Sequence, residues 1–395
     1  MTPLVPRVCV LVCDSWGVGD APDAAAYGDV GSDTLGNTAR AVGGIRAPHL
    51  AALGLGTLTA IEGLPPGGAA GTAAGRATEV SAGKDTTTGH WEMMGIRVDR
   101  PFPLYPDGFP ASIMGPFEAR IGTPSLGNVP ASGTEIIERL GAEHLRTGAP
   151  IVYTSGDSVF QIAAHTDRVP LETLYAWSLI ARDLLTGPHA VGRVIARPFD
   201  GEPGAFRRRP ERRDYSLPPP GPTTLDALAT AGVPVVAIGK IRDVFVGHGI
   251  DSWSYSDSND HGVDLTVEAL REPGTRLVFT NLVDFDSKYG HRNDPDGYAR
   301  AVEAFDARVP DVLAALGGGV LLVTGDHGCD PTTPSTDHSR ERTPLLAGGL
   351  VGGPHDIGTR GSFADLGATV AELLGVATPE LPGTSFVDRL GPVGP

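Results

Sequence analysis

The chain has 395 residues, and its 31 Lys and Arg residues are outnumbered by 47 Asp and Glu residues, for a formal net charge of −16. This length allows one large domain or two. The acidic balance argues against non-specific nucleic-acid binding and against attraction to anionic lipid. No apolar run approaches the ~18 residues of a membrane span, and we expect no signal peptide. We therefore expect partners other than nucleic acid or membranes.

The three cysteines agree with a reducing compartment. Cys9 and Cys13 fall in one predicted strand, where four residues at ~3.3 Å each separate their Cα atoms by roughly 13 Å. A disulfide requires Cα atoms within about 7 Å. We interpret both as buried thiols, and we expect a cytoplasmic protein.

The first predicted strand covers residues 8–12 and runs into Asp14, which is followed by Ser15 and Gly17. A carboxylate at this place is either a turn former and helix cap or a ligand. Helices are predicted over 37–42 and 48–53. Residues 64–77 are rich in Gly, Ala and Pro and are expected to form an ordered surface loop.

Residues 81–92 read SAGKDTTTGHWE and allow two interpretations. In one, threonine hydroxyls cap the helix that contains Trp91. In the other, a threonine is a nucleophile activated by a base or a metal. Spacing alone does not choose among Thr86, Thr87 and Thr88, and the role of His90 stays open.

A proline-rich segment begins at residue 100, and three prolines occupy 218–220. We interpret residues 100–217 as an inserted domain between the two parts of a core, 1–99 and 218–395. Predicted helices (134–145 and 171–185) and strands (151–154, 159–163 and 191–196) give the insert an α+β composition. Five arginines in residues 207–213 are either a solvated loop or a bidentate grip on phosphate.

Strands and helices alternate after the prolines, which predicts a mostly parallel sheet. The predicted strands cover 233–238, 275–283, 320–323 and 344–347, and the predicted helices cover 224–231, 263–271, 296–316 and 363–374. Two of these strands run into Asp286 with His291 and into Asp326 with His327, and His338 follows a loop rich in Pro, Ser and Thr.

Parallel strands place their carboxyl ends at one edge of a sheet, where open α/β folds bind ligands. We therefore expect Asp14, Asp286, His291, Asp326, His327 and His338 to converge. Three carboxylates and three imidazoles are enough for two divalent ions, and ligands without sulfur favour Mn²⁺, Mg²⁺ or Zn²⁺. Oxygen-rich ligands beside hydroxyl groups favour a catalytic site over a structural one. We interpret Cys329 as a bystander.

Five motifs in combination, running from one end of the chain to the other, resemble those of the phosphopentomutase family of the alkaline phosphatase superfamily. They are DS at Asp14, GKDTTTGHWE ending at Glu92, NLVDFD through His291, GDHG around Asp326, and TDH ending at His338. The resemblance implies an alkaline-phosphatase-like α/β core, with a mostly parallel sheet flanked by helices and an inserted smaller α+β cap domain.

The resemblance also implies a reaction that interconverts ribose 1-phosphate and ribose 5-phosphate, and the 2-deoxyribose equivalents, with a sugar bisphosphate as activator. It implies two Mn²⁺ ions, one held by Asp14, Asp326 and His327 and the other by Asp286, His291 and His338. Thr86 matches the phosphorylated nucleophile. Implied substrate contacts are Asp157, Arg193, Arg207 and Lys240, while Gly156 and Arg242 depart from the family pattern.

Other functions remain open from the sequence. A phosphohydrolase or phosphodiesterase on the same core would release free phosphate, whereas another phosphosugar mutase would differ only in substrate. A non-catalytic metal or phosphosugar binder would need no nucleophile in residues 84–92. The oligomeric state is not predicted.

Overall fold

The computed structural model describes residues 2–155 and 158–393. The chain forms two compact units, a larger one of Met1–Arg100 with Pro218–Pro395 and a smaller one of Pro101–Leu217. The boundaries between the two units fall at the two proline-rich segments, as is common for linkers between domains.

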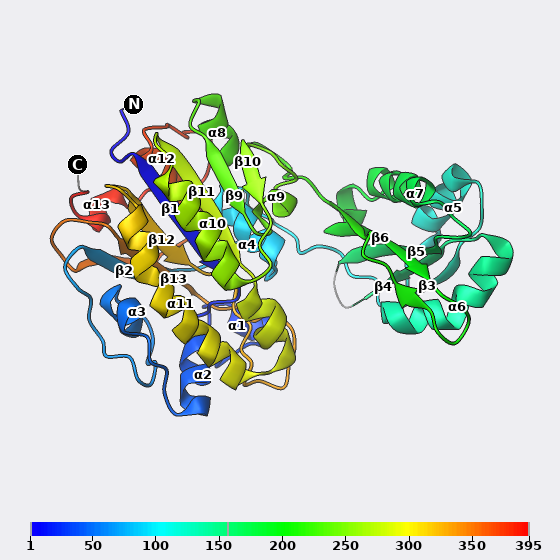
Figure 1. The fold of residues 1–395 in the computed structure, drawn as a ribbon, viewed down its shortest axis with the longest axis horizontal. Coiled ribbons are helices and arrows are strands. Elements are labelled where there is room, and N and C mark those ends of the chain that lie inside the picture. The colour runs from blue at the N-terminus through cyan, green and yellow to red at the C-terminus, as the bar shows by residue number, and fades with distance from the viewer. Residues whose placement is uncertain (1, 156–157, 394–395) are drawn as a thin grey trace. The chain divides into compact units, whose positions relative to one another are not determined.

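In the described part of the larger unit, eight strands form one sheet in the order β10-β9-β11-β1-β12-β13-β2-β14 (Figure 1). Only β13 runs against the others. The strands are β1 (Arg7–Cys13), β2 (Thr72–Ala77), β9 (Val235–Ile238), β10 (Ser252–Ser254), β11 (Arg276–Leu282), β12 (Val320–Thr324), β13 (Thr343–Gly348) and β14 (His355–Arg360). The expected mostly parallel sheet is confirmed.

Helices cover both faces of this sheet (Figure 1). The main core packs Leu11 and Leu321 of the sheet against Leu35, Leu50 and Val302 of the helices. The helices and helical turns are α1 (Ala24–Tyr27), α2 (Thr34–Val42), α3 (Pro48–Ala52), η1 (Leu55–Thr57), α4 (Thr86–Met93), α8 (Thr224–Thr230), α9 (Ile241–Val244), α10 (Asn259–Arg271), η3 (Phe285–Tyr289), η4 (Gly290–Arg292), α11 (Pro295–Ala315), α12 (Ala364–Leu373) and α13 (Val387–Leu390).

Strands β1 and β12 are apolar on both faces, with every residue of β12 buried. This is the pattern of a central strand in a sheet covered by helices on both sides. Residues 72–77, in contrast, were expected to lie in a loop, and that expectation is wrong because they form β2. Their sequence, TAAGRA, is poor in β-branched residues, and pairing with β13 and β14 supplies the strand hydrogen bonds.

The smaller unit is built on a mixed sheet in the order β3-β4-β5-β6-β7, with β8 also pairing with β6. Its strands are β3 (Leu126–Pro130), β4 (Ile151–Thr154), β5 (Val159–His165), β6 (Arg193–Asp200), β7 (Arg207–Arg208) and β8 (Arg213–Ser216), and its helices are α5 (Ala111–Ile121), α6 (Gly133–Thr147), α7 (Leu171–Leu184) and η2 (Gly187–His189). Helix α5 and strand β3 were not predicted, because prolines and glycines interrupt their periodicity.

Two small cores stabilise this unit. Phe117 and Phe160 pack edge to face in the core beneath α5 and α7, at 5.2 Å between ring centroids. Ile136 and Phe199 belong to the core beneath α6. Within residues 2–155 and 158–393, no helix combines the length and the apolar character needed to cross a bilayer.

Candidate metal centre

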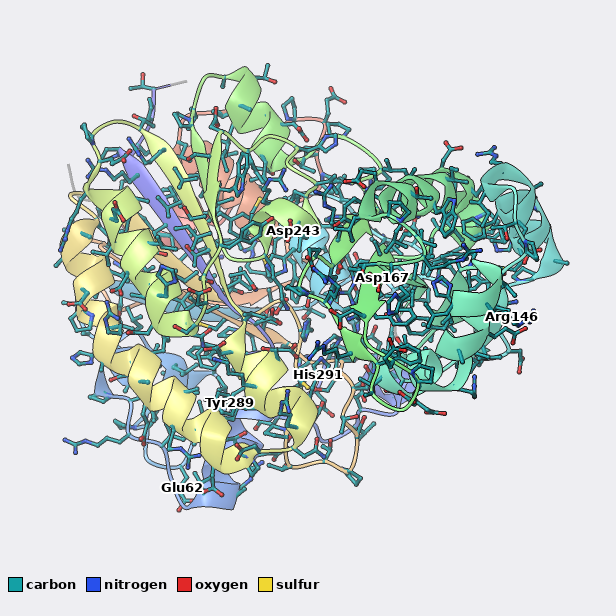
Figure 2. All side chains as sticks on the ribbon, turned by 45° about the vertical axis from the view of Figure 1, so that its right-hand side comes forward. Glu62, Arg146, Asp167, Asp243, Tyr289 and His291 are labelled. Atoms are coloured by element: carbon teal, nitrogen blue, oxygen red, sulfur yellow. The ribbon has the colours of Figure 1, made fainter. Side chains whose placement is uncertain are left out.

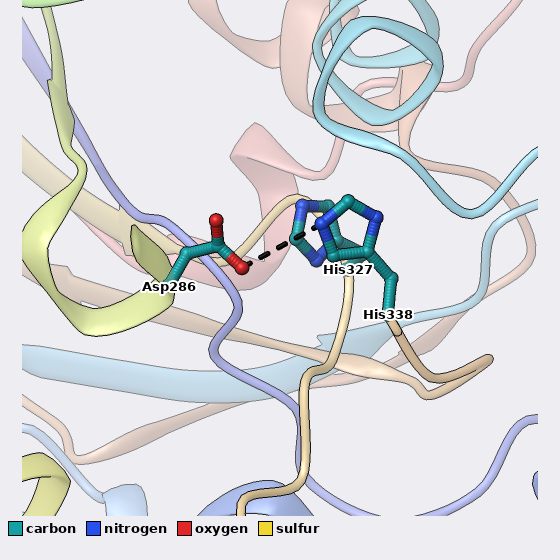
Figure 3. A group of neighbouring side chains, drawn as sticks. All are labelled: Asp286, His327 and His338. Atoms are coloured by element: carbon teal, nitrogen blue, oxygen red, sulfur yellow. Dashed lines mark ion pairs between the residues drawn. The ribbon is translucent and has the colours of Figure 1, made fainter. Parts of the chain in front are cut away.

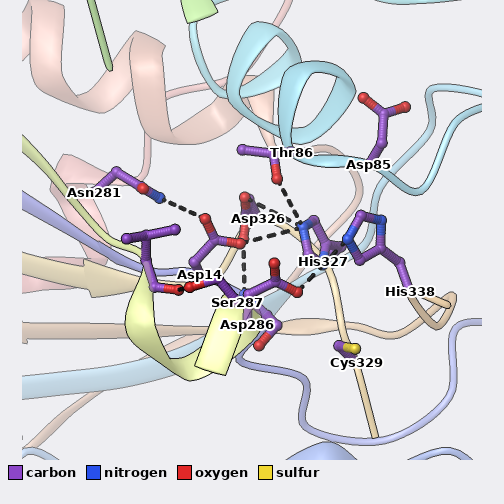
Figure 4. Close-up of polar contacts among 12 residues, drawn as sticks. Asp14, Asp85, Thr86, Asn281, Asp286, Ser287, Asp326, His327, Cys329 and His338 are labelled. Carbon is purple, nitrogen blue, oxygen red and sulfur yellow. Dashed lines mark hydrogen bonds and ion pairs between the residues drawn. The ribbon is translucent and has the colours of Figure 1, made fainter. Parts of the chain in front are cut away.

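Three adjacent parallel strands, β11, β1 and β12, end at the same edge of the larger unit's sheet. Their ends carry Asp286, Asp14 and Asp326 in that order along the sheet. Figure 4 shows the three carboxylates lying close together, with His327 and His338 beside them. The convergence expected from a parallel sheet is therefore present.

The first group consists of Asp14, Asp326 and His327, all of them buried. Nε2 of His327 lies 3.4 Å from Oδ1 of Asp14 and 3.5 Å from Oδ2 of Asp326. The other ring nitrogen, Nδ1, lies 3.0 Å from the carbonyl oxygen of Gly328. A donor at Nδ1 leaves Nε2 facing two carboxylates, and Nε2 can bind a metal ion there once its own proton has left.

The second group surrounds Asp286. Nε2 of His291 lies 3.2 Å from one carboxylate oxygen, and Nε2 of His338 lies 3.6 Å from the other, the contact drawn in Figure 3. His291 and Tyr289 lie in the short turns after β11 (Figure 2). His338 and His327 also approach each other, with ring centroids 3.9 Å apart.

The grouping around Asp286 differs in detail from the expected one. Asp286 forms one possible ligand set with His327 and His338 and another with His291 and Cys329. Cys329, which we had interpreted as a bystander, places its Sγ 4.0 Å from Nδ1 of His291 and 3.7 Å from the carbonyl oxygen of Asp337. Burial raises the pKa of this thiol, which favours the protonated form.

Two features of the local backbone orient these side chains. Ser15 has a positive φ of 73°, which is uncommon for a residue other than glycine. Its N–H donates to Oδ1 of Asp326 at 3.0 Å, and its carbonyl oxygen accepts from the Tyr298 hydroxyl at 3.0 Å. Asp286 lies in η3, a π-helical turn, a local geometry that often occurs at functional sites.

Electrostatics at the site favour ionised carboxylates. Burial opposes the charge of Asp286, but hydrogen bonds from His291 and His338 hold its pKa well below the ordinary range. Burial is likewise outweighed at Asp326 by the charge of His327 and by the contact with His90, and the pKa of Asp326 is lowered to about 2. The hydrogen bond that His291 donates to Asp286 raises the pKa of His291 to about 11. The carboxylates therefore attract positive charge, either protons or metal ions.

Several buried polar atoms at this edge have no hydrogen-bond partner among the described residues. They are Oδ1 of Asp14, Oδ1 of Asp286, Oδ2 of Asp326 and Nε2 of His338. Buried polar atoms normally have partners, and these four all belong to expected metal ligands. The residues present thus fit divalent metal ions bound by carboxylate oxygens and imidazole nitrogens.

The threonine motif lies over the same edge. Asp85, and not a threonine, caps helix α4, with its Oδ1 accepting from the Thr88 N–H at 3.1 Å. The Thr88 hydroxyl donates to the other oxygen of Asp85 at 2.6 Å. Oγ1 of Thr86 instead lies 3.2 Å from Nε2 of His327 (Figure 4), which makes Thr86 the candidate nucleophile.

The expected substrate contacts lie in different places. Lys240 is at the metal centre, with Nζ 3.5 Å from Oδ2 of Asp14. Arg193 and Arg207 belong to the smaller unit and pair with Asp214 at 3.7 Å and Asp200 at 2.8 Å. Asp157, like Gly156, lies outside the described residues. The arginine-rich segment is thus paired with carboxylates at several points.

Sequence reasoning missed three residues that support the centre. Asn281 donates to Oδ2 of Asp14 at 3.1 Å, and its place at the end of a strand within a recognised motif was a usable signal. Ser15 also lies in a recognised motif, but its role depends on a backbone conformation with positive φ. Arg340 gave no such signal, because its role depends on contacts with Gly83 and Glu79, which are far away in the sequence.

The chain is similar to known proteins over most of its length. The model of the metalloenzyme superfamily matches residues 6–378. The phosphopentomutase of Anaeromyxobacter dehalogenans is 57% identical over 383 residues, covering 96% of this chain and 97% of that protein. The phosphopentomutase of Kosmotoga olearia is 55% identical over 383 residues, covering 96% and 98%. The chain belongs to the phosphopentomutase family.

Membership in the phosphopentomutase family makes this protein an isomerase of the phosphotransferase-mutase kind and a metalloenzyme that uses a divalent metal. Its fold is similar to the crystal structure of Leishmania mexicana phosphoglycerate mutase at low cobalt concentration, with a TM-score of 0.50, 13% identity, and 97% and 98% of the two chains covered. That similarity concerns the fold alone. The expected alkaline-phosphatase-like fold is confirmed.

Proposed function

We propose that the protein interconverts ribose 1-phosphate and ribose 5-phosphate, and their 2-deoxyribose equivalents, by carrying the phosphoryl group on Thr86. The observation that carries this proposal is the position of the Thr86 hydroxyl, 3.2 Å from Nε2 of His327 within the cluster of buried carboxylates and histidines. Thr86 is also the first residue of α4, where unpaired N–H groups and the helix dipole favour a bound phosphoryl group.

Two Mn²⁺ ions are the proposed cofactors. Asp14, Asp326 and His327 would hold one ion, and Asp286, His291 and His338 would hold the other. When bound, the ions would neutralise phosphoryl charge and lower the pKa of a nearby hydroxyl. Three aspartates carry −3 against +4 for two divalent ions, so the loaded centre would retain an attraction for phosphate.

The proposed reaction moves one phosphoryl group between oxygens. The bond between Thr86 Oγ1 and phosphorus breaks as a hydroxyl oxygen of the pentose phosphate forms a new bond to phosphorus, and the proton of that hydroxyl passes to the Thr86 oxygen. The product is a pentose bisphosphate. After this intermediate reorients, the reverse transfer returns its other phosphoryl group to Thr86. A sugar bisphosphate would phosphorylate Thr86 in enzyme that has lost its phosphate.

We assign residues 100–217 the role of a cap that presents the pentose phosphate. Asp157 would contact the sugar, while Arg193, Arg207 and Lys240 would contact phosphate. The exposed Lys240 ammonium beside Asp14 supports an anion contact at the metal centre. In the smaller unit, the buried hydroxyl of Tyr153 has no hydrogen-bond partner among described residues, and its surroundings include Arg197, Arg208 and Arg212. Guanidinium groups near this hydroxyl support recognition of a phosphorylated substrate, and Arg212 is also paired with Asp214.

The proposal is tested by replacing Thr86 with alanine and assaying ribose 1-phosphate with Mn²⁺ and a sugar bisphosphate. We expect at least a ~10³-fold loss of kcat, because the covalent intermediate cannot form. Thr87→Ala is the matched control and should retain most of the activity. Mass spectrometry of the wild-type protein should locate a phosphate on Thr86. Mutase activity retained by Thr86→Ala would overturn the proposal, and free phosphate released instead of the isomer would indicate a phosphohydrolase.

A further inference from the structure

His90 lies in the threonine motif but has no place in the reaction proposed above. Its side chain is fully buried in the second turn of α4, four residues after Thr86. Nδ1 lies 2.9 Å from the carbonyl oxygen of Thr86 and 3.2 Å from Oδ2 of Asp326. Both neighbours of Nδ1 are acceptors, so Nδ1 carries the proton.

The other ring nitrogen completes a link to a second carboxylate. Nε2 lies 3.5 Å from Nδ2 of Asn281, and this same amide donates to Oδ2 of Asp14 at 3.1 Å. A ring protonated at Nδ1 presents an acceptor at Nε2, which matches the amide donor. Asn281 is itself buried and fixed on β11, so it cannot turn its amide toward water.

From these contacts we infer that His90 is a positioning residue that sets Thr86 and the carboxylates of Asp326 and Asp14 in one fixed arrangement. The inference rests on the proposed function, because it takes these carboxylates as metal ligands. In this inference His90 acts through the groups that it orients, without touching substrate or metal. Oδ1 of Asp14 has no hydrogen-bond donor among the described residues, and it is therefore available to an ion.

Close packing of α4 against Asp326 restricts where His90 can lie. Gly89 precedes His90, and a Cβ at that position would lie 2.2 Å from the carbonyl oxygen of Asp326. The first turns of α4 thus pack directly against the backbone of a ligand. The two acceptors at Nδ1 and the ring of Phe279 orient the His90 ring. The centroids of the His90 and Phe279 rings are 6.0 Å apart.

Substitutions at position 90 test the roles of the two ring nitrogens of His90 separately. His90→Asn can keep an N–H donor at the place of Nδ1, His90→Gln moves its amide to the place of Nε2, and His90→Phe removes both groups. The probe is Mn²⁺ alone, with free Mn²⁺ measured by electron paramagnetic resonance. We expect His90→Gln and His90→Phe to bind Mn²⁺ about 10–100-fold more weakly at one of two sites, as outer-shell substitutions typically do. We expect His90→Asn to remain within about threefold of wild type.

Kinetics supply a second measurement. Because His90 does not touch the substrate, kcat should fall in His90→Gln with little change in KM for ribose 5-phosphate. Asp326→Asn tests the underlying centre and should lose Mn²⁺ at one site whatever the role of His90. If Asp326→Asn binds Mn²⁺ as wild type does, the proposed centre is wrong. If it loses Mn²⁺ while His90→Phe does not, only the inference about His90 is wrong.

A purely structural role of His90 can be distinguished from the proposed positioning role. If His90→Phe fails to fold, the comparison of His90→Asn with His90→Gln decides, because both keep a polar amide in the same helix. Equal Mn²⁺ affinity in these two variants would overturn the inference, since it assigns the effect to Nδ1. Thermal unfolding of the metal-free variants measures any loss of stability separately.

Discussion

The carbonyl oxygen of Gly83 accepts a 2.7 Å hydrogen bond from Nη1 of Arg340, which joins the segment before Thr86 to the segment after His338. The same guanidinium pairs with Oε2 of Glu79 at 2.6 Å, and both side chains are almost fully buried. Arg340 thereby connects the segment before the candidate nucleophile to the loop that contains a candidate metal ligand, although Gly83 and Arg340 are 257 positions apart in the sequence.

Replacing Arg340 with methionine should therefore destabilise the protein and lower its activity. Removing one member of a buried ion pair leaves the other charge without compensation, which typically costs about 3–5 kcal/mol. Urea denaturation measures this loss. Arg308→Met is the control, because Arg308 contacts Asp260, Asp264 and Asp311, whose side chains are largely exposed, and exposed pairs contribute little. Equal losses in the two variants would contradict the role assigned to Arg340.

Gly89→Ala should impair the centre without unfolding the protein. The added Cβ would meet the carbonyl oxygen of Asp326 at 2.2 Å, so α4 and Thr86 must move away from the metal ligands. We expect a loss of at least tenfold in kcat, measured in the mutase assay with Mn²⁺. Gly115→Ala in α5 is the matched control, since a Cβ there meets nothing within 4 Å. That change should be neutral or stabilise the helix by about 0.5–1 kcal/mol.

Binding of Mn²⁺ at pH 7 should release protons. The hydrogen bond that His291 donates to Asp286 raises the pKa of His291 to about 11, so the metal-free imidazole is protonated at neutral pH. An ion can bind only after this proton leaves, and apparent affinity should therefore increase with pH. Isothermal titration calorimetry in buffers of different ionisation enthalpy counts the protons. Release of no proton at pH 7 would be inconsistent with His291 as a ligand.

The buried carboxyl group of Glu341 should make stability depend on pH. Burial raises its pKa to about 8, against the lowering effect of hydrogen bonds from Thr34 and Ser339. The folded state then holds this proton more tightly than the unfolded state, whose pKa is near 4.5. Stability from this group is fully present below about pH 4.5 and is lost as pH rises toward 8, by up to about 1.4 kcal/mol per unit.

Comparison with Glu341→Gln isolates this contribution. Glutamine is nearly isosteric and stays neutral, so the variant lacks the pH-dependent penalty. The free energy of unfolding of the variant, relative to wild type, should increase between pH 5 and pH 8 in urea titrations of the metal-free protein. A difference that stays constant over this range would show that Glu341 does not titrate there.

Much of the core followed from local patterns. Residues 8–12 and 320–323 were predicted as strands because they are short apolar runs rich in β-branched residues, and they form the central strands β1 and β12. Strand β2 was missed, because residues 72–77 are held as a strand by their neighbours and not by their own propensity. Helix α5 was missed for a related reason, since Pro116 lies inside it and interrupts the expected signal.

The candidate site, like the fold, was predicted only in part from the sequence. The sequence by itself determined that carboxylates and histidines follow strand ends, because that order is local and parallel strands bring such ends to one edge. Only the tertiary structure decided which threonine faces His327, that Asp286 contacts His291 and His338 through different oxygens, and that His90 and Arg340 support the centre. These relations depend on distances between segments far apart in the chain, and such distances arise only when the whole core packs.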